Sequence, residues 1–104
     1  MKPNKIFSLL GLAQKAGSLV SGEYMTENKI KSKAAKLVIV GEDASENTRK
    51  QFSSMCEFYG VPLFFYGKKE ELGHAIGKEF RASLAVLDAG FAGSLIRMLE
   101  EERR

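Results

Sequence analysis

The chain has 104 residues, 44% of them apolar and 28% charged, which is the composition of one ordinary globular domain spanning residues 1–104. The single cysteine excludes an internal disulfide, and one cysteine with one histidine excludes a zinc finger or zinc ribbon. The net charge of +3 is too small to identify a partner by itself.

The excess of positive charge belongs to the first 40 residues. This segment holds seven lysines against two glutamates, whereas residues 41–104 hold nine basic and eleven acidic side chains. An apolar stretch over 6–13 follows Lys5, but it is too short to cross a bilayer. We therefore expect a protein of the cytoplasm that does not contact the membrane.

The first third of the chain predicts two helices with a very short strand between them. Apolar residues recur at helical spacing over 6–13, and Gly17 is placed to end this helix. Residues 19–20 read as a strand, and Ser21 is a good N-cap for a second helix over about 22–33. This second helix has few apolar residues, so we expect it to lie near the surface with an accessible N-terminus.

The remainder of the chain alternates apolar strand runs with helical patterns. The predicted elements are, in order, a strand over 37–40, a helix from Asp43 or Ser45 to Gly60, a strand over 61–66, a helix over 70–76, a strand over 84–87 and a helix after Asp88. This alternation predicts an α/β fold of the three-layer α/β/α sandwich type, with right-handed crossovers wherever neighbouring strands are parallel.

The sequence lacks the signatures of nucleotide-binding enzymes. No two glycines are two residues apart, and no glycine–lysine pair precedes serine or threonine, so the dinucleotide fingerprint and the P-loop are excluded. Glu42, Asp43 and Asp88 follow strands and form a candidate magnesium site of an enzyme or a phospho-receiver. The alternative, in which these acids stabilise helix starts, is favoured. We expect no catalytic residue, no metal and no cofactor.

The second predicted helix carries two features that favour an anionic partner. Its lysines form a basic cluster, which either neutralises phosphates or is a solvated helix face: Lys29, Lys31, Lys33 and Lys36. Gly22 opens the helix, where unpaired N–H groups and the positive end of the helix dipole favour an anion, and a glycine lets a phosphate approach closely. Taken together, the lysines and the Gly22 turn favour an anionic partner at this end of the helix.

Three segments, which follow one another along the chain in the order expected of the family, resemble the L7Ae/L30e ribosomal protein superfamily. They are KLVIVGEDA at 36–44, CEFYGVP at 56–62, and 69–77 with its Leu-Gly-x-Ala-x-Gly pattern. The segments 11–17 and 42–48 are similar to a small bacterial branch of this superfamily, the YlxQ-like proteins. The resemblance covers residues 6–99 and implies an L30e-like fold and RNA binding, typically of kink-turns, as a ribosomal protein or another part of the translation machinery.

The resemblance also implies where RNA is bound. In the family, a Gly-Thr-Asn-Glu-x-x-Lys motif opens the second helix and reads guanine edges, and the loop after the Leu-Gly-x-Ala-x-Gly helix packs on an extruded nucleotide. The corresponding candidates here are Gly22, Glu23, Tyr24, Met25 and Asn28, the neighbouring Lys29 and Lys33, and in the loop Gly77, Arg81 and Ala82.

This sequence keeps the glycine of the motif and departs from it at the base-reading positions. Glu23, Tyr24 and Met25 stand where threonine, asparagine and glutamate are expected, and Asn28 stands in place of the lysine. Each lost base contact contributes about 1–3 kcal/mol of discrimination. We therefore expect a ribosomal or other structured RNA as partner, bound through phosphates and stacking on Tyr24, with an altered base preference and no DNA specificity.

A second function stays open on the same fold. Tyr24 and Met25 are also side chains that a protein-interaction module presents to a partner chain. Ionic strength separates the two functions, because RNA binding weakens steeply with salt and apolar contact between proteins does not. The magnesium-dependent enzyme or receiver is the third and least favoured possibility.

Overall fold

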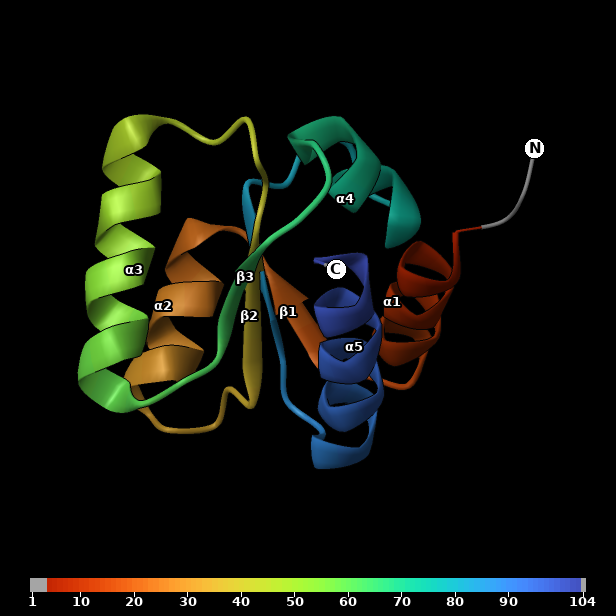
Figure 1. The fold of residues 1–104 in the computed structure, drawn as a ribbon, viewed down its shortest axis with the longest axis horizontal. Helices are drawn as coiled ribbons and strands as arrows, with labels where there is room; N and C mark the ends of the chain where they lie inside the picture. Colours follow the sequence, from red (N-terminus) through yellow and green to blue (C-terminus); the bar gives the residue numbers. More distant parts are fainter. Residues whose placement is uncertain (1–3, 104) are drawn as a thin grey trace.

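The computed structural model describes residues 4–103; Lys2 and Arg104, which entered the charge count, lie outside this range. The elements are α1 (Lys5–Lys15), β1 (Leu19–Ser21), α2 (Glu23–Lys31), β2 (Leu37–Val40), α3 (Glu46–Tyr59), β3 (Leu63–Phe65), α4 (Lys69–Ala75), β4 (Ser83–Val86) and α5 (Ala89–Glu102). Helices cover both faces of the single sheet (Figure 1), which confirms the predicted α/β/α sandwich. None of the helices in this range is long and apolar enough to span a bilayer.

Alternate residues of the strands build two apolar layers. The face toward α1, α4 and α5 is formed by Leu19, Leu37, Ile39, Phe64, Leu84 and Val86. The opposite face, toward α2 and α3, is formed by Val38, Val40 and Ala85. Every residue of the two central strands, β2 and β4, is fully buried, as their apolar runs predict.

The sheet is mixed, and this decides which loops meet. Its order is β1-β4-β2-β3, with β4 antiparallel to both of its neighbours and β2 parallel to β3. As a result β1, β2 and β3 all end at the edge of the sheet where β4 begins. We call this edge the loop edge; it carries Gly22 and the loops 41–45, 66–68 and 76–82.

Side-chain caps begin three of the long helices, and α2 is the exception. Asn4, Ser45 and Asp88 each accept a backbone N–H of the helix that follows them. The prediction of Ser21 as the cap of α2 is wrong, because Ser21 is the last residue of β1. Gly22 takes the N-cap position without a side-chain hydrogen bond, so α2 begins one residue later than predicted.

The three acids of the candidate magnesium site do not come together. Because β4 is antiparallel to β2, Asp88 lies at the opposite edge of the sheet from Glu42 and Asp43. Asp88 Oδ2 accepts the N–H of Phe91 at 2.9 Å, and Asp43 Oδ1 accepts the N–H of Lys69, the first residue of α4, at 2.8 Å. Within residues 4–103 no group of three His, Cys, Asp or Glu side chains is placed to hold a metal ion. The candidate magnesium site formed jointly by the three acids is therefore wrong. Asp43 and Asp88 stabilise helix starts instead.

Candidate functional site

The loop edge joins the two segments that the sequence singled out as RNA contacts. The pairing of β1 with β4 places the start of α2 beside the loop that leads into β4. The N–H of Gly22 donates to the carbonyl of Ser83 at 2.9 Å, and Nε of Arg81 donates to Oγ of Ser21 at 3.0 Å. Gly22 and the loop 76–82 therefore form one surface, although about 60 residues separate them in the chain.

Gly22 gives α2 an open N-terminus. Its φ of 92° lies in a region that side chains rarely adopt, whereas an added Cβ would meet no atom within 4 Å. The backbone conformation, rather than packing, therefore requires glycine here. The first intrahelical bond runs from Thr26 N–H to the Gly22 carbonyl at 3.0 Å. The N–H groups of 23–25 precede that bond and have no side-chain cap, so they are donors for an anion at the loop edge.

The side chains around this helix start are exposed and mostly apolar. Tyr24 exposes 75% of its surface and Met25 40%, while Phe80 in the adjoining loop exposes 63%. The inward face of α2 is formed instead by Thr26 and Ile30, which are fully buried. Tyr24 therefore does not cover the edge of the core, and its ring is available for stacking.

The other motif positions of α2 lie on its outer surface. Glu23 and Asn28 are both exposed. Asn28 is one turn beyond Tyr24, so these two side chains share a face of the helix. Glu23 is in the first turn, where its charge suits the helix dipole but repels phosphate.

Arg81 ties the loop 76–82 to the sheet. Its backbone N–H donates to the carbonyl of Lys69 at 3.0 Å, and Nη1 donates to the carbonyl of Phe80 at 2.8 Å. Together with the bond to Ser21, these contacts hold a half-buried guanidinium between β1 and the loop. Two of its five N–H donors are used in this way. Arg81 thus positions the loop, and its remaining donors are those that a phosphate would meet.

Gly77 and Ala82 shape the same loop. Gly77 ends α4 in the left-handed region with φ 75°. The carbonyl of Ala82 accepts the N–H of Gly41 at 2.9 Å, which joins the loop to the end of β2. A Cβ on Gly73 would coincide with the carbonyl of Glu79, so the glycine in α4 lets the loop close over the helix. The Leu-Gly-x-Ala-x-Gly pattern therefore has a packing cause at Gly73 and a conformational one at Gly77.

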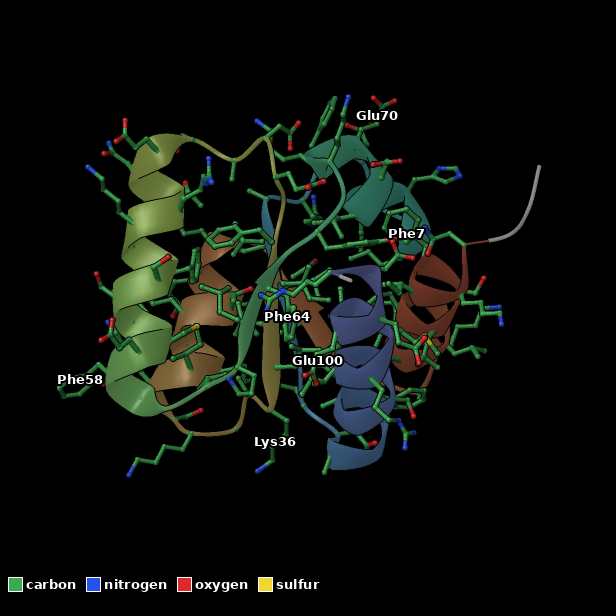
Figure 2. The ribbon with its side chains drawn as sticks, in the orientation of Figure 1. Phe7, Lys36, Phe58, Phe64, Glu70 and Glu100 are labelled. Carbon is green, nitrogen blue, oxygen red and sulfur yellow. The ribbon has the colours of Figure 1, made fainter. Side chains whose placement is uncertain are left out.

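The basic cluster lies at the other end of α2. Its members lie in the second half of the helix or in the segment after its last residue: Lys29, Lys31, Lys33 and Lys36. Nine helical residues extend about 13 Å, so most of this cluster is remote from Gly22. Figure 2 shows Lys36 at the end of the molecule that faces away from α4. The expectation that the lysines and the Gly22 turn act at one end of the helix is wrong.

One lysine of the cluster is paired. Lys31 Nζ lies 2.8 Å from Glu27 Oε1, and this hydrogen bond and charge raise the pKa of Lys31. Glu27 also accepts a 3.2 Å hydrogen bond from Gln51 of α3. Glu27 therefore links α2 to α3, while both members of the ion pair stay partly exposed.

The loop edge itself is not basic. Its loops 41–45, 66–68 and 76–82 hold three acidic and three basic side chains. Net charge therefore does not attract an anion to this edge. What this edge offers a ligand is backbone N–H donors and exposed rings.

Comparison with known proteins places this chain in a family. The model of the ribosomal protein L7Ae/L30e/S12e/Gadd45 family matches residues 4–96. The chain belongs to this family. RNA-binding protein YlxQ of Bacillus subtilis (strain 168) is 46% identical over 94 residues, which are 90% of this chain and 94% of that protein. RNA-binding protein YlxQ of Enterococcus faecium is 38% identical over 96 residues, 92% of each protein. The family and branch that the sequence resembles are thereby confirmed.

Solved structures share the fold. A protein with unknown function from Bacillus halodurans C has a TM-score of 0.91 and 36% identity, covering 94% of this chain and 99% of the other. The Giardia lamblia 15.5kD RNA binding protein has a TM-score of 0.80 at 18% identity, covering 97% of this chain and 92% of the other. The second similarity is one of fold, and it agrees with the L30e-like sandwich that the sequence predicts.

Proposed function

We propose that this protein is a non-catalytic, cytoplasmic RNA-binding domain, whose targets are structured RNAs such as kink-turns, with ribosomal RNA as the first to test. Family membership and two relatives named as RNA-binding proteins support it. The observation that carries the proposal is the joining of the Gly22 turn and the loop 76–82 into one exposed surface.

The proposed contacts at the loop edge are of two kinds. Backbone N–H groups of 23–25 bind a phosphate or a base edge at the positive end of α2. Tyr24 stacks on an unpaired base, which is worth about 1–3 kcal/mol per base and is tolerant of sequence. Phe80, exposed in the adjoining loop, offers a second ring for the same purpose.

The base-reading power of this surface is reduced. Tyr24, Met25 and Asn28 occupy the positions that read guanine edges in the family. Three lost contacts amount to roughly 3–9 kcal/mol, against a specific-over-nonspecific margin of about 4–10 kcal/mol for protein–DNA complexes. We therefore propose that the protein prefers a kink-turn to a plain duplex by less than about 10³-fold.

Substitution of Tyr24 tests this proposal directly. Fluorescence anisotropy with a labelled kink-turn RNA is expected to show that Tyr24→Ala weakens binding by at least about fivefold, whereas Tyr24→Phe keeps the stacking surface and most of the affinity. Leu12→Ala is the matched control, because Leu12 is an exposed apolar side chain on α1, in the other helical layer. The proposal fails if the wild-type protein binds no structured RNA at low salt, or if Tyr24→Ala binds as tightly as wild type.

A protein partner is the second candidate for this surface. The exposed Tyr24, Met25 and Phe80 lie on an edge without net positive charge, which favours apolar contact with another chain. Such binding would change little across a salt series, whereas RNA binding would weaken steeply. A partner captured with salt-independent affinity that Tyr24→Ala abolishes would favour this candidate.

A further inference from the structure

The four lysines near the end of α2 have no role in the contacts proposed at the loop edge. No acidic residue occurs between Glu27 and Glu42, so the segment 29–36 carries a local charge of four. We call this segment the lysine end. The loop edge, by contrast, has as many acidic as basic side chains. The molecule thus separates the exposed Tyr24 and Phe80 rings from its strongest positive charge.

Lys33 occupies a backbone position that normally belongs to glycine. Its φ is 65°, and it is the one non-glycine residue with positive φ within residues 4–103. Helices α1 and α3 end in the same left-handed conformation with Gly17 (φ 72°) and Gly60 (φ 69°). A side chain is unfavourable there, because its Cβ approaches the following carbonyl oxygen. The chain carries lysine where glycine favours the fold, which points to a use for the ammonium group.

The lysine end is accessible to a large ligand. Lys33 and Lys36 are exposed, and neither takes part in the two ion pairs found in the described part of the chain. Lys31 pairs with Glu27 at a partly exposed site, where such pairs are weak and exchange readily for another anion. Phe58, 81% exposed at the end of α3, projects at the same end of the molecule as Lys36 (Figure 2).

We infer that the lysine end is a second RNA contact, which holds the phosphate backbone of a duplex arm continuing from the RNA bound at the loop edge. This inference rests on the function proposed above. The exposed side chains of Tyr24 and Asn28 lie one turn apart and lead along α2 from the loop edge toward the lysines, over about 13 Å. Phosphate neutralisation dominates RNA affinity, and the lysine end supplies the charge that the loop edge lacks.

The variant Lys33→Gly separates a binding role from a structural one. Replacing lysine by glycine at this φ is expected to raise the Tm by about 4 °C, because it relieves the unfavourable conformation. For a kink-turn RNA with a long duplex arm, the affinity is expected to fall about fivefold at ~0.1 M salt. The slope of log Kobs against log salt is expected to become less steep by about 0.7–0.9, the contribution of one phosphate contact. Arg97→Ala on α5 removes the same charge from the other helical layer and keeps wild-type affinity.

Varying the length of the RNA's duplex arm gives the decisive comparison between the variants. With the arm cut back to a few pairs, wild type and Lys33→Gly are expected to bind equally, while Tyr24→Ala still binds more weakly than either. If Lys33→Gly keeps the wild-type salt slope on the long arm while Tyr24→Ala loses affinity, the second contact is refuted and the loop-edge site stands. If wild type binds neither RNA, both proposals fail. Displacement of the long-arm RNA by polyglutamate as readily as by unlabelled duplex would assign the lysine end to acidic peptides and overturn the inference.

Discussion

At the scale of single residues, Cys56 is the clearest titratable group inside the fold. It is buried in the layer between α2, α3 and the sheet, and this burial raises the pKa of its thiol to about 11. The protonated thiol is therefore favoured in the folded state. The resulting stability is complete below the ordinary thiol pKa near 9 and is lost as the pH rises toward 11.

We predict a loss of stability at alkaline pH that depends on Cys56. Between pH 9 and pH 10 the free energy of unfolding should fall by about 1 kcal/mol more in the wild type than in Cys56→Ala. Urea denaturation of both proteins at each pH measures this difference, and the alanine variant corrects for the lysines and tyrosines that titrate in the same range. Equal losses in the two proteins would show that the thiol is not held in its protonated form.

Gly73 and Gly93 give a second prediction at this scale, because both are glycines within helices. A Cβ at Gly73 would coincide with the carbonyl of Glu79, whereas one at Gly93 meets no atom within 4 Å. Gly73→Ala should destabilise the protein by about 1–3 kcal/mol and displace the loop 76–82, which also weakens RNA binding. Gly93→Ala should stabilise it by about 0.5–1 kcal/mol.

Thermal unfolding of the two variants measures both effects. Opposite signs are expected, since the same chemical change meets a packed carbonyl in one case and open space in the other. A Gly73→Ala variant as stable as the wild type would mean that the loop does not close over α4 in solution.

Single residues also show where sequence reasoning reaches its limit. Gly22 was identifiable because a glycine before a helix has a local cause, and so were the caps Ser45 and Asp88. The burial of Thr26 was not, because a threonine among charged residues carries no apolar signal. Its neighbour is Ser83, whose Oγ donates to Thr26 Oγ1 at 3.5 Å from 57 residues along the chain.

At the scale of elements, the strands and helices followed from apolar periodicity, but their directions did not. The apolar run of β4 has the same pattern in either direction, so nothing in it indicates that β4 is antiparallel to β2. That direction separates Asp88 from Asp43 and brings Gly22 to the loop 76–82. The misplaced lysines have a different cause, because the rise of about 1.5 Å per helical residue separates 29–36 from Gly22 whatever the neighbouring elements are.

Asp43 supplies a testable link between two elements. Its Oδ1 accepts the N–H of Lys69 at 2.8 Å, which joins the loop after β2 to the start of α4. Asp43→Ala should lower the free energy of unfolding by about 1 kcal/mol, as the loss of a helix cap does, while Asp43→Asn should retain most of it. Glu42→Ala is the control, because no hydrogen bond of the Glu42 side chain is found among residues 4–103. Urea denaturation of the three variants measures the difference, and a Glu42→Ala loss as large as that of Asp43→Ala would contradict it.

At the scale of the whole molecule, α2 connects two surfaces of different chemistry. One end presents a glycine turn, open N–H groups and exposed rings, and the other presents four lysines without an acid between them. The small net charge of the chain conceals this separation. In the proposed complex, RNA that follows α2 from one end to the other meets stacking first and phosphate neutralisation second.

One titration tests this account most directly: amide NMR shifts of the protein recorded as a kink-turn RNA with a long duplex arm is added. We expect the largest changes at 22–36 and 76–82, along α2 and at the loop edge, and little change along α1 and α5. Changes concentrated on α1 and α5, with α2 unaffected at saturating RNA, would contradict the account.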